Sequence, residues 1–148
     1  MNSLIQNVKL CRDGEKLLRF IQKIDKTLPV PLSARVDIAE FAKRNLERGF
    51  VLAIEDETGE LACAAIFYYN FRSDVAAYLD LMATAPEYYG RGYAKAVMDA
   101  MEDMARRDGM TEFHLHTNDT NKAALSLYGN RGYEIIAHDP KVHMKKNL

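Results

Sequence analysis

Two glycines flank an arginine in the segment Tyr89-Gly90-Arg91-Gly92-Tyr93, which comes directly before a long helical pattern. Glycine lets the backbone approach a ligand closely, and the first turn of a helix has N–H groups that lack partners. Those N–H groups and the helix dipole favour an anion, most often a phosphate, and Arg91 adds a positive charge. The segment therefore predicts a ligand that carries phosphate.

The elements on either side of this loop are a strand and a helix. Val75–Thr84 has the apolar pattern of a strand. After the loop, apolar residues recur at helical spacing until Gly109 ends the pattern, and they predict an amphipathic helix. These apolar residues are Ala94, Val97, Met98, Met101, Met104 and Ala105.

The rest of the chain alternates between strand and helix patterns. The turn Asp56–Gly59 joins two of the strands, Ser33 is expected to cap the second helix, and Gly49 is expected to end it. This order predicts a single α/β (α+β) domain over residues 1–148, with a mixed sheet of about six to seven strands and four helices. The further strands are expected at Ser3–Leu10, Phe50–Glu55, Leu61–Tyr69, Thr111–Thr117, Tyr133–Ala137 and Val142–Lys145, and the further helices at Asp13–Lys26, Arg35–Arg48 and Lys122–Asn130.

Composition excludes several classes of protein. The chain has 20 basic and 21 acidic residues, and this balance argues against general nucleic-acid binding. No apolar run approaches the roughly 20 residues of a membrane span, and the first residues lack the apolar core of a signal peptide. Cys11 and Cys63 show no metal or disulfide spacing, which favours packing thiols in a reducing cytoplasm.

His114 and His116 share one face of the expected strand Thr111–Thr117 and so form a candidate metal pair. No third and fourth ligand follows at a suitable spacing, so no metal is expected.

The loop segment resembles motif A of the GNAT superfamily of N-acetyltransferases, whose pattern is Gln/Arg-x-x-Gly-x-Gly/Ala. In this chain the frame is Tyr89-Gly90-Arg91-Gly92-Tyr93-Ala94, in which Gly92 and Ala94 match. Tyr89 departs from the pattern because it stands where Gln or Arg is usual.

A second segment is similar to motif B of the same family, N-x-x-A-x-x-L-Y-x-x-x-G-F/Y. Every fixed position matches, and the strand–helix order between the motifs also fits, so the resemblance covers about Phe50 to Ala137. The matching residues are Asn121, Ala124, Leu127, Tyr128, Gly132 and Tyr133.

The resemblance implies the GNAT fold, with strands splayed at an acetyl-CoA slot, and it implies acetyl-CoA as cosubstrate. Backbone N–H groups of the loop and helix start would bind the pyrophosphate. Asn121 would hydrogen-bond the pantetheine amide, and backbone groups at the end of the strand before the loop would pair with the pantetheine arm. The implied cofactor-binding residues are Met82, Ala83, Thr84, Gly90, Arg91, Gly92, Tyr93, Ala94, Lys95 and Asn121.

The resemblance also implies a general acid, because Tyr128 matches the family's usual proton donor to the departing thiolate. A phenol with a reference pKa of about 10 stays protonated at neutral pH and can donate. The general base is open between two residues. His116 stands five residues before the motif B asparagine, where some relatives have a carboxylate, and Asp80 lies on the strand before the loop.

The expected activity is direct acetyl transfer from acetyl-CoA to a primary amine of a small molecule, an amino sugar or a peptide. The alternative is a non-catalytic module of this fold that senses an acyl-CoA or another small ligand. A nicotinamide enzyme is disfavoured, because Lys95 occupies the third glycine position of its fingerprint. The oligomeric state stays open, a homodimer included.

Overall fold

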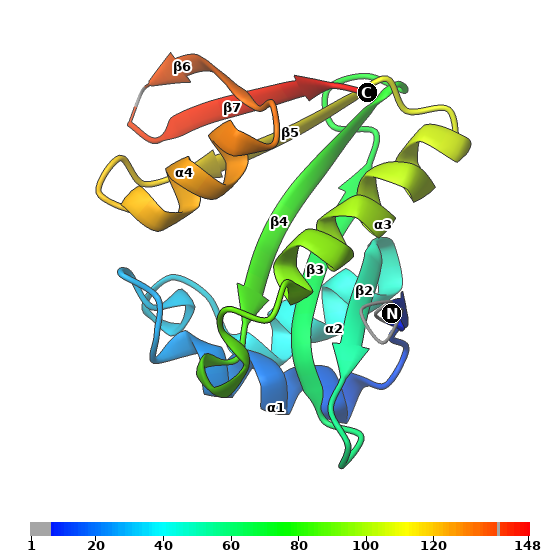
Figure 1. Ribbon diagram of the computed structural model, residues 1–148, viewed down its shortest axis with the longest axis vertical. Coiled ribbons are helices and arrows are strands. Elements are labelled where there is room, and N and C mark those ends of the chain that lie inside the picture. The colour runs from blue at the N-terminus through cyan, green and yellow to red at the C-terminus, as the bar shows by residue number, and fades with distance from the viewer. Residues whose placement is uncertain (1–6, 139) are drawn as a thin grey trace. The chain divides into compact units, whose positions relative to one another are not determined.

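The computed structural model describes residues 7–138 and 140–148, and within these residues the chain forms four α-helices and a mixed sheet of seven strands (Figure 1). The strand order in the sheet is β1-β2-β3-β4-β5-β7-β6. The elements are β1 (Lys9–Leu10), α1 (Gly14–Asp25), the 3-10 helix η2 (Leu32–Ala34), α2 (Ile38–Arg48), β2 (Phe50–Glu55), β3 (Leu61–Tyr69), β4 (Ala76–Thr84), the 3-10 helix η3 (Pro86–Tyr88), α3 (Tyr93–Arg107), β5 (Glu112–Thr117), α4 (Lys122–Asn130), β6 (Glu134–His138) and β7 (Val142–Asn147).

This arrangement confirms the predicted fold class. The predicted strand Ser3–Leu10 is seen only as the two residues of β1, and its first four residues lie outside the described part of the chain. In the described ranges, none of the helices is both long enough and apolar enough to cross a membrane.

Two compact units make up the described chain. The first unit holds residues 7–67 and 81–101, and the second holds 68–80 and 102–148 apart from 139. Strands β3 and β4 and helix α3 each contribute residues to both units. The prediction of a single domain stays a prediction.

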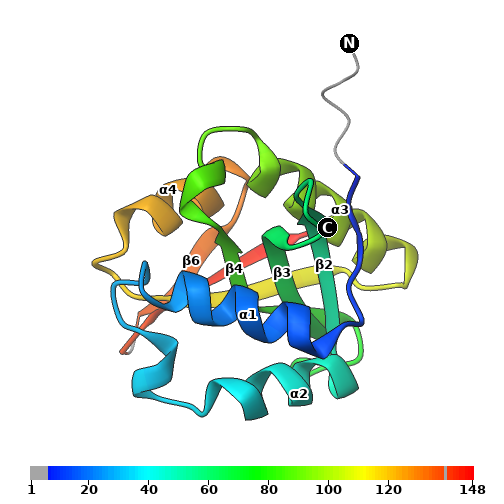
Figure 2. The same cartoon turned by 90° about the horizontal axis from the view of Figure 1, so that it is seen from below.

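In the first unit, α1 and α2 pack against the hairpin formed by β2 and β3 (Figure 2). Both helices begin at an aspartate whose side chain accepts backbone N–H groups, Asp13 for α1 and Asp37 for α2. Their apolar faces form one core with the strands. Its buried residues include Leu17, Phe20, Ile21, Ile24, Phe41, Ala42, Val51, Ala53, Ala64 and Ile66.

The start of α2 corrects one prediction. The sequence predicts a helix that is capped by Ser33 and starts near Arg35. In the structure the cap is Asp37 and the helix begins at Ile38. Ser33 lies in η2 instead, where its hydroxyl donates to Asp25 Oδ2 at 2.5 Å and its N–H donates to Oδ1 at 3.1 Å. The buried carboxylate at the end of α1 therefore takes both donors of Ser33.

The β2–β3 hairpin has the predicted antiparallel register, with Phe50 opposite Phe67 and Ala53 opposite Ala64. Its turn is closed by Asp56, whose Oδ1 accepts the N–H groups of Thr58 and Glu60 and the Thr58 hydroxyl. This aspartate also reaches the segment that follows β4, as described below.

In the second unit, β4 and β5 are parallel, and β5 pairs with β7 in an antiparallel ladder. The parallel ladder joins Ala76–Leu79 to Glu112–Leu115, so Asp80 and His116 are the next residues beyond its last pair. In the antiparallel ladder, His114 stands opposite Lys145 and His116 stands opposite His143. This register brings histidines from two strands together.

Candidate active site

The glycine loop lies in the first unit, between η3 and α3. Gly90 and Gly92 have φ angles of +78° and +79°, a region that side chains disfavour, whereas Arg91 between them is not among the residues with positive φ. Such alternation of backbone sign turns successive N–H groups toward a common point, which is the geometry of an anion-binding nest. Helix α3 begins at Tyr93, so the start of the helix and the loop are contiguous as predicted.

Arg91 is held in place by an aromatic ring that the sequence analysis does not single out. Its guanidinium lies over the Tyr88 ring at 5.1 Å from the centroid. The Tyr88 hydroxyl donates to Asp56 Oδ2 at 3.0 Å, and this contact raises the Tyr88 pKa. Tyr93, the first helical residue, packs near Tyr88 with ring centroids 5.9 Å apart. The turn of the β2–β3 hairpin thereby anchors the ring beneath Arg91.

The remaining predicted residues around the loop differ in exposure. Lys95 is exposed, and its ammonium pairs with Asp99 at 2.9 Å along the helix. Tyr89, at the position that departs from motif A, is 59% exposed. Ala94 is half-buried on α3.

Met82, Ala83 and Thr84 form the end of β4 and are all half-buried. Ala83 packs against the core of the first unit, and the Thr84 hydroxyl donates to Cys63 Sγ at 3.3 Å. The Ala83 and Thr84 side chains are therefore engaged within this unit, and the use of backbone groups at these positions stays a prediction.

Asn121 in the second unit is the N-cap of α4. Its Oδ1 accepts the N–H of Ala124 at 3.1 Å, so the side-chain group that remains for a ligand is the Nδ2 donor.

Tyr128 lies on α4 and is 7% exposed. Its ring meets the Tyr133 ring nearly edge to face, with centroids 5.8 Å apart at 61°. Burial raises the pKa of the Tyr128 phenol, so the group keeps its proton at neutral pH. Across the described residues, its hydroxyl makes no hydrogen bond. The hydrogen of the Tyr128 hydroxyl is therefore not accepted by any group of the described chain.

The ring beside Tyr128 is fixed by a buried carboxylate on α3. The Tyr133 hydroxyl donates to Glu102 Oε2 at 2.9 Å, and Glu102 is only 3% exposed. Arg131 and Lys146 donate to the other oxygen at 2.9 and 2.8 Å. The charges of Arg131 and Lys146 and the Tyr133 hydroxyl thus compensate the Glu102 carboxylate. These contacts fix the segment that follows α4 against α3.

His116 on β5 is half-buried, and its Nδ1 lies 2.8 Å from the Tyr78 hydroxyl in a hydrogen bond. Burial is the main cause that lowers its pKa below the usual value, and the nearby charges of Arg72, Lys141 and His114 act in the same direction. A neutral imidazole at physiological pH is able to accept a proton.

Two further histidines, His114 and His143, form a cluster with His116. His143 is not predicted as a site residue from the sequence. The His143 ring stacks on the His116 ring with centroids 4.3 Å apart, and burial lowers the His143 pKa to about 4. His143 Nε2 lies 2.9 Å from His114 Nδ1, and His114 Nε2 lies 2.8 Å from Glu112 Oε1. No signal in the sequence reveals this set, because it depends on the β5–β7 register.

Asp80 is the other candidate base, and it is exposed on β4. Its charge helps to raise the pKa of the Tyr68 phenol, although burial of that phenol is the larger cause. Tyr68 packs against Tyr78 with ring centroids 5.4 Å apart, so the phenol that Asp80 influences contacts the ring whose hydroxyl is bonded to His116. Among the described residues, no group of three or more His, Cys, Asp or Glu is arranged to bind a metal ion.

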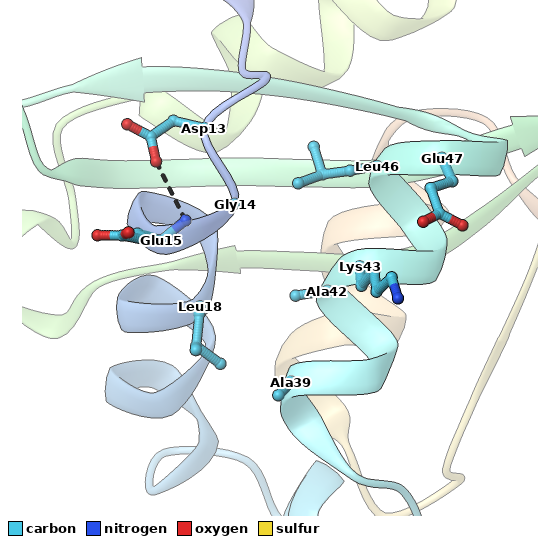
Figure 3. Close-up of a pocket in the computed structure, with 9 residues that line it drawn as sticks. All are labelled: Asp13, Gly14, Glu15, Leu18, Ala39, Ala42, Lys43, Leu46 and Glu47. Atoms are coloured by element: carbon cyan, nitrogen blue, oxygen red, sulfur yellow. Dashed lines mark hydrogen bonds between the residues drawn. The ribbon is translucent and has the colours of Figure 1, made fainter.

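A groove of about 520 Å³ lies between α1 and α2, and none of its lining residues is a predicted site residue (Figure 3). Leu18, Ala39, Ala42 and Leu46 point toward the space between the helices, while Lys43 and Glu47 come from the next positions of α2. Asp13 at its end is occupied as the cap of α1. The groove contains no arrangement of catalytic groups.

The profile of the Acetyltransferase (GNAT) family matches residues 17–133. This match covers more than half of the sequence and contains both predicted motifs. The chain therefore belongs to the GNAT acetyltransferase family.

Solved structures share the fold at low sequence identity. A GNAT acetyltransferase from Staphylococcus aureus Mu50 is 15% identical with a TM-score of 0.77, covering 95% of this chain and 99% of its own. The ribosomal-protein-S18-alanine N-acetyltransferase of Escherichia coli is 18% identical with a TM-score of 0.77, covering 97% and 94%. The PaiA N-acetyltransferase of Thermoplasma acidophilum, solved with coenzyme A, is 14% identical with a TM-score of 0.72, covering 96% and 99%. A sequence search of curated proteins gives no match.

Proposed function

We propose that this protein is an N-acetyltransferase that transfers an acetyl group from acetyl-CoA directly to a primary amine. The observation that carries the proposal is the loop before α3, where Gly90 and Gly92 adopt positive φ on either side of Arg91. Such a loop at a helix start suits a diphosphate. Membership of the family identifies coenzyme A as the diphosphate ligand to test first.

In this proposal the coenzyme is bound mainly through main-chain groups. The N–H groups from Gly90 to Lys95 bind the pyrophosphate, with Arg91 as the neighbouring cation. Backbone groups of Met82, Ala83 and Thr84 pair with the pantetheine arm, and Asn121 donates from Nδ2 to its amide oxygen. The cap geometry of Asn121 supports this last role, because only Oδ1 is used within α4.

The chemical step makes one bond and breaks one. The amine nitrogen bonds to the thioester carbon, the C–S bond breaks, and the electron pair of that bond goes to sulfur. The Tyr128 hydroxyl then gives its proton to the thiolate, and the proton that the new amide nitrogen loses restores the phenol by way of solvent. Burial keeps this phenol protonated at neutral pH, so its proton is present when the thiolate forms.

The amine needs a lone pair before it attacks, so a base must remove a proton from the ammonium form. His116 and Asp80 are the two candidates on the described chain. His116 has the lowered pKa of a neutral imidazole and a fixed partner in Tyr78, and these features favour it over the exposed carboxylate.

The proposal treats the 148 residues as one acetyltransferase domain, which the family match supports because residues 17–133 include parts of both units. It places the protein in the cytoplasm, where the unpaired thiols of Cys11 and Cys63 would stay reduced. The acceptor is a small molecule, an amino sugar or a peptide amine.

A panel of primary amines tests the proposal, with thiol release from acetyl-CoA as the readout. Turnover of at least one amine, with the acetylated amine seen by mass spectrometry, is the expected result. Coenzyme A binding without turnover of any amine in a panel of all three acceptor classes would favour a ligand-sensing module. Absence of coenzyme A binding would refute the proposal.

A further inference from the structure

The histidine cluster of the second unit contains more than a candidate base. Tyr78, His116, His143, His114 and Glu112 form a continuous set of hydrogen bonds and ring contacts across β4, β5 and β7. His114 and His143 are only 8% and 6% exposed. Little water therefore competes for their ring nitrogens, and the hydrogen bonds between protein groups are strengthened.

Glu112 fixes the hydrogen positions at one end of this set. Its pKa is lowered, first by the contact with His114, so it is a carboxylate at neutral pH and can only accept. His114 Nε2 therefore carries a hydrogen. The contact between His114 Nδ1 and His143 Nε2 at 2.9 Å holds one further hydrogen, which lies between the two rings.

At the other end, His116 has two arrangements with Tyr78. If the phenol donates to Nδ1, the hydrogen of the neutral ring is on Nε2 and the ring has no lone pair left to accept a proton. If Nδ1 carries the hydrogen and donates to the phenol oxygen, Nε2 has the lone pair. Only the second arrangement is a base, and its imidazolium keeps the same hydrogen bond.

We propose that Tyr78 is a positioning residue that holds His116 with its hydrogen on Nδ1, leaving Nε2 to take a proton from the acceptor amine. The chain from Glu112 through His114 keeps an uncharged His143 ring stacked against His116. In the step itself, an N–H bond of the ammonium breaks and an N–H bond on Nε2 forms, with no change of oxidation state. This inference rests on the proposed acetyltransferase function.

The groups that face His116 agree with a base that is neutral before it reacts. The partners on the strands are one phenol and two imidazoles, and both imidazoles belong to the chain that ends at Glu112. The two cations, Arg72 and Lys141, come from loops and oppose a second positive charge. Arg72 itself is held over the Phe71 ring at 4.8 Å.

Nitrogen-15 NMR of the histidine side chains tests the inference without any substrate. At pH 7, His116 is expected to show a protonated Nδ1 and an unprotonated Nε2, and His143 is expected to be neutral. His138, which is exposed and has its Nε2 at 3.3 Å from Asp119 Oδ2, provides the reference for a surface histidine. A hydrogen on Nε2 of His116, or an imidazolium at pH 7, would overturn the inference.

Tyr78→Phe keeps the ring and removes the oxygen that accepts from Nδ1. We expect kcat/KM to fall by roughly 10- to 100-fold, less than the 10²- to 10⁴-fold that a general base itself contributes, because the imidazole is still present. The acid limb of the pH profile should move to lower pH, because the imidazolium has lost its acceptor. Tyr69→Phe is the matched control, since the Tyr69 hydroxyl donates to Asp108 and not to a histidine.

An unchanged acid limb in Tyr78→Phe, or an equal change in Tyr69→Phe, would overturn the positioning role. These outcomes differ from failure of the proposed function. Turnover by a protein in which the His116 hydrogen is on Nε2 would contradict the role of Tyr78 but not the acetyltransferase activity. Binding of coenzyme A without turnover of any amine would contradict both.

Discussion

Replacing Gly92 separates the role of the loop in ligand binding from its role in folding. The φ angle of this residue is +79°, and a Cβ built there meets no protein atom within 4 Å. Alanine therefore costs backbone strain of about 1–2 kcal/mol but causes no clash inside the protein. Any loss of coenzyme A affinity beyond that strain comes from the ligand that the Cβ would crowd.

Aspartate at the same position adds a charge to the added Cβ. A carboxylate at about 6 Å from one diphosphate charge is repelled by about 3 kcal/mol at an effective dielectric constant of 20. Because every 1.4 kcal/mol is tenfold in affinity, Gly92→Asp should weaken coenzyme A binding by roughly 100-fold. Salt should reduce this loss, since screening weakens an exposed repulsion.

Gly109→Ala is the matched control. Its φ angle is +92°, nothing lies within 4 Å of the added Cβ, and it follows the C-terminal end of α3. Calorimetric titration with coenzyme A and thermal unfolding should show similar destabilisation in Gly92→Ala and Gly109→Ala, with weaker binding only in the first. Wild-type affinity in Gly92→Asp would refute the assignment of the loop.

Three other substitutions test the second unit. Tyr128→Phe should lower kcat by about 10²- to 10⁴-fold in the thiol-release assay without changing the Kd of coenzyme A; equal kcat would remove it as the acid. Glu102→Gln should lower the free energy of unfolding by about 3–5 kcal/mol in urea titrations, because it removes the buried negative charge that pairs with both Arg131 and Lys146; a loss below 1 kcal/mol would contradict this. His143 has a folded pKa of about 4, below its unfolded value, so the unfolded chain binds more protons and stability should fall as pH drops from about 6.5 to 4. His143→Phe should flatten that fall, while the exposed His138→Phe should not.

The sequence predicted the elements well where local signals agreed. Capping side chains, turn residues and apolar periodicity placed α1, the β2–β3 hairpin, α3 and α4 within a few residues of their observed bounds. The predicted start of α2 was wrong, because Ser33 and Asp37 are both good caps and the choice between them depends on a tertiary contact. Asp25 takes the Ser33 side chain, and this carboxylate lies eight residues earlier.

The candidate site was predictable as far as local motifs reach. The positive φ of Gly90 and Gly92 and the cap at Asn121 follow from residue type and spacing. The position of the Tyr88 ring beneath Arg91 was not predictable, because the Tyr88 hydroxyl is bound to Asp56, which lies in a turn far away in the sequence. The same limit applies to His143, because only the register of β5 with β7 places it against His116.

Motif B shows why a matching pattern does not by itself assign a catalytic role. Asn121 caps α4, Gly132 has a φ angle of +94°, and the Tyr133 hydroxyl is bound to a buried carboxylate, so these positions serve the fold directly. Tyr128 differs, because its hydroxyl is without a hydrogen bond in the part of the chain that the structure describes. Tyr128 is therefore the motif B side chain that we propose as the acid.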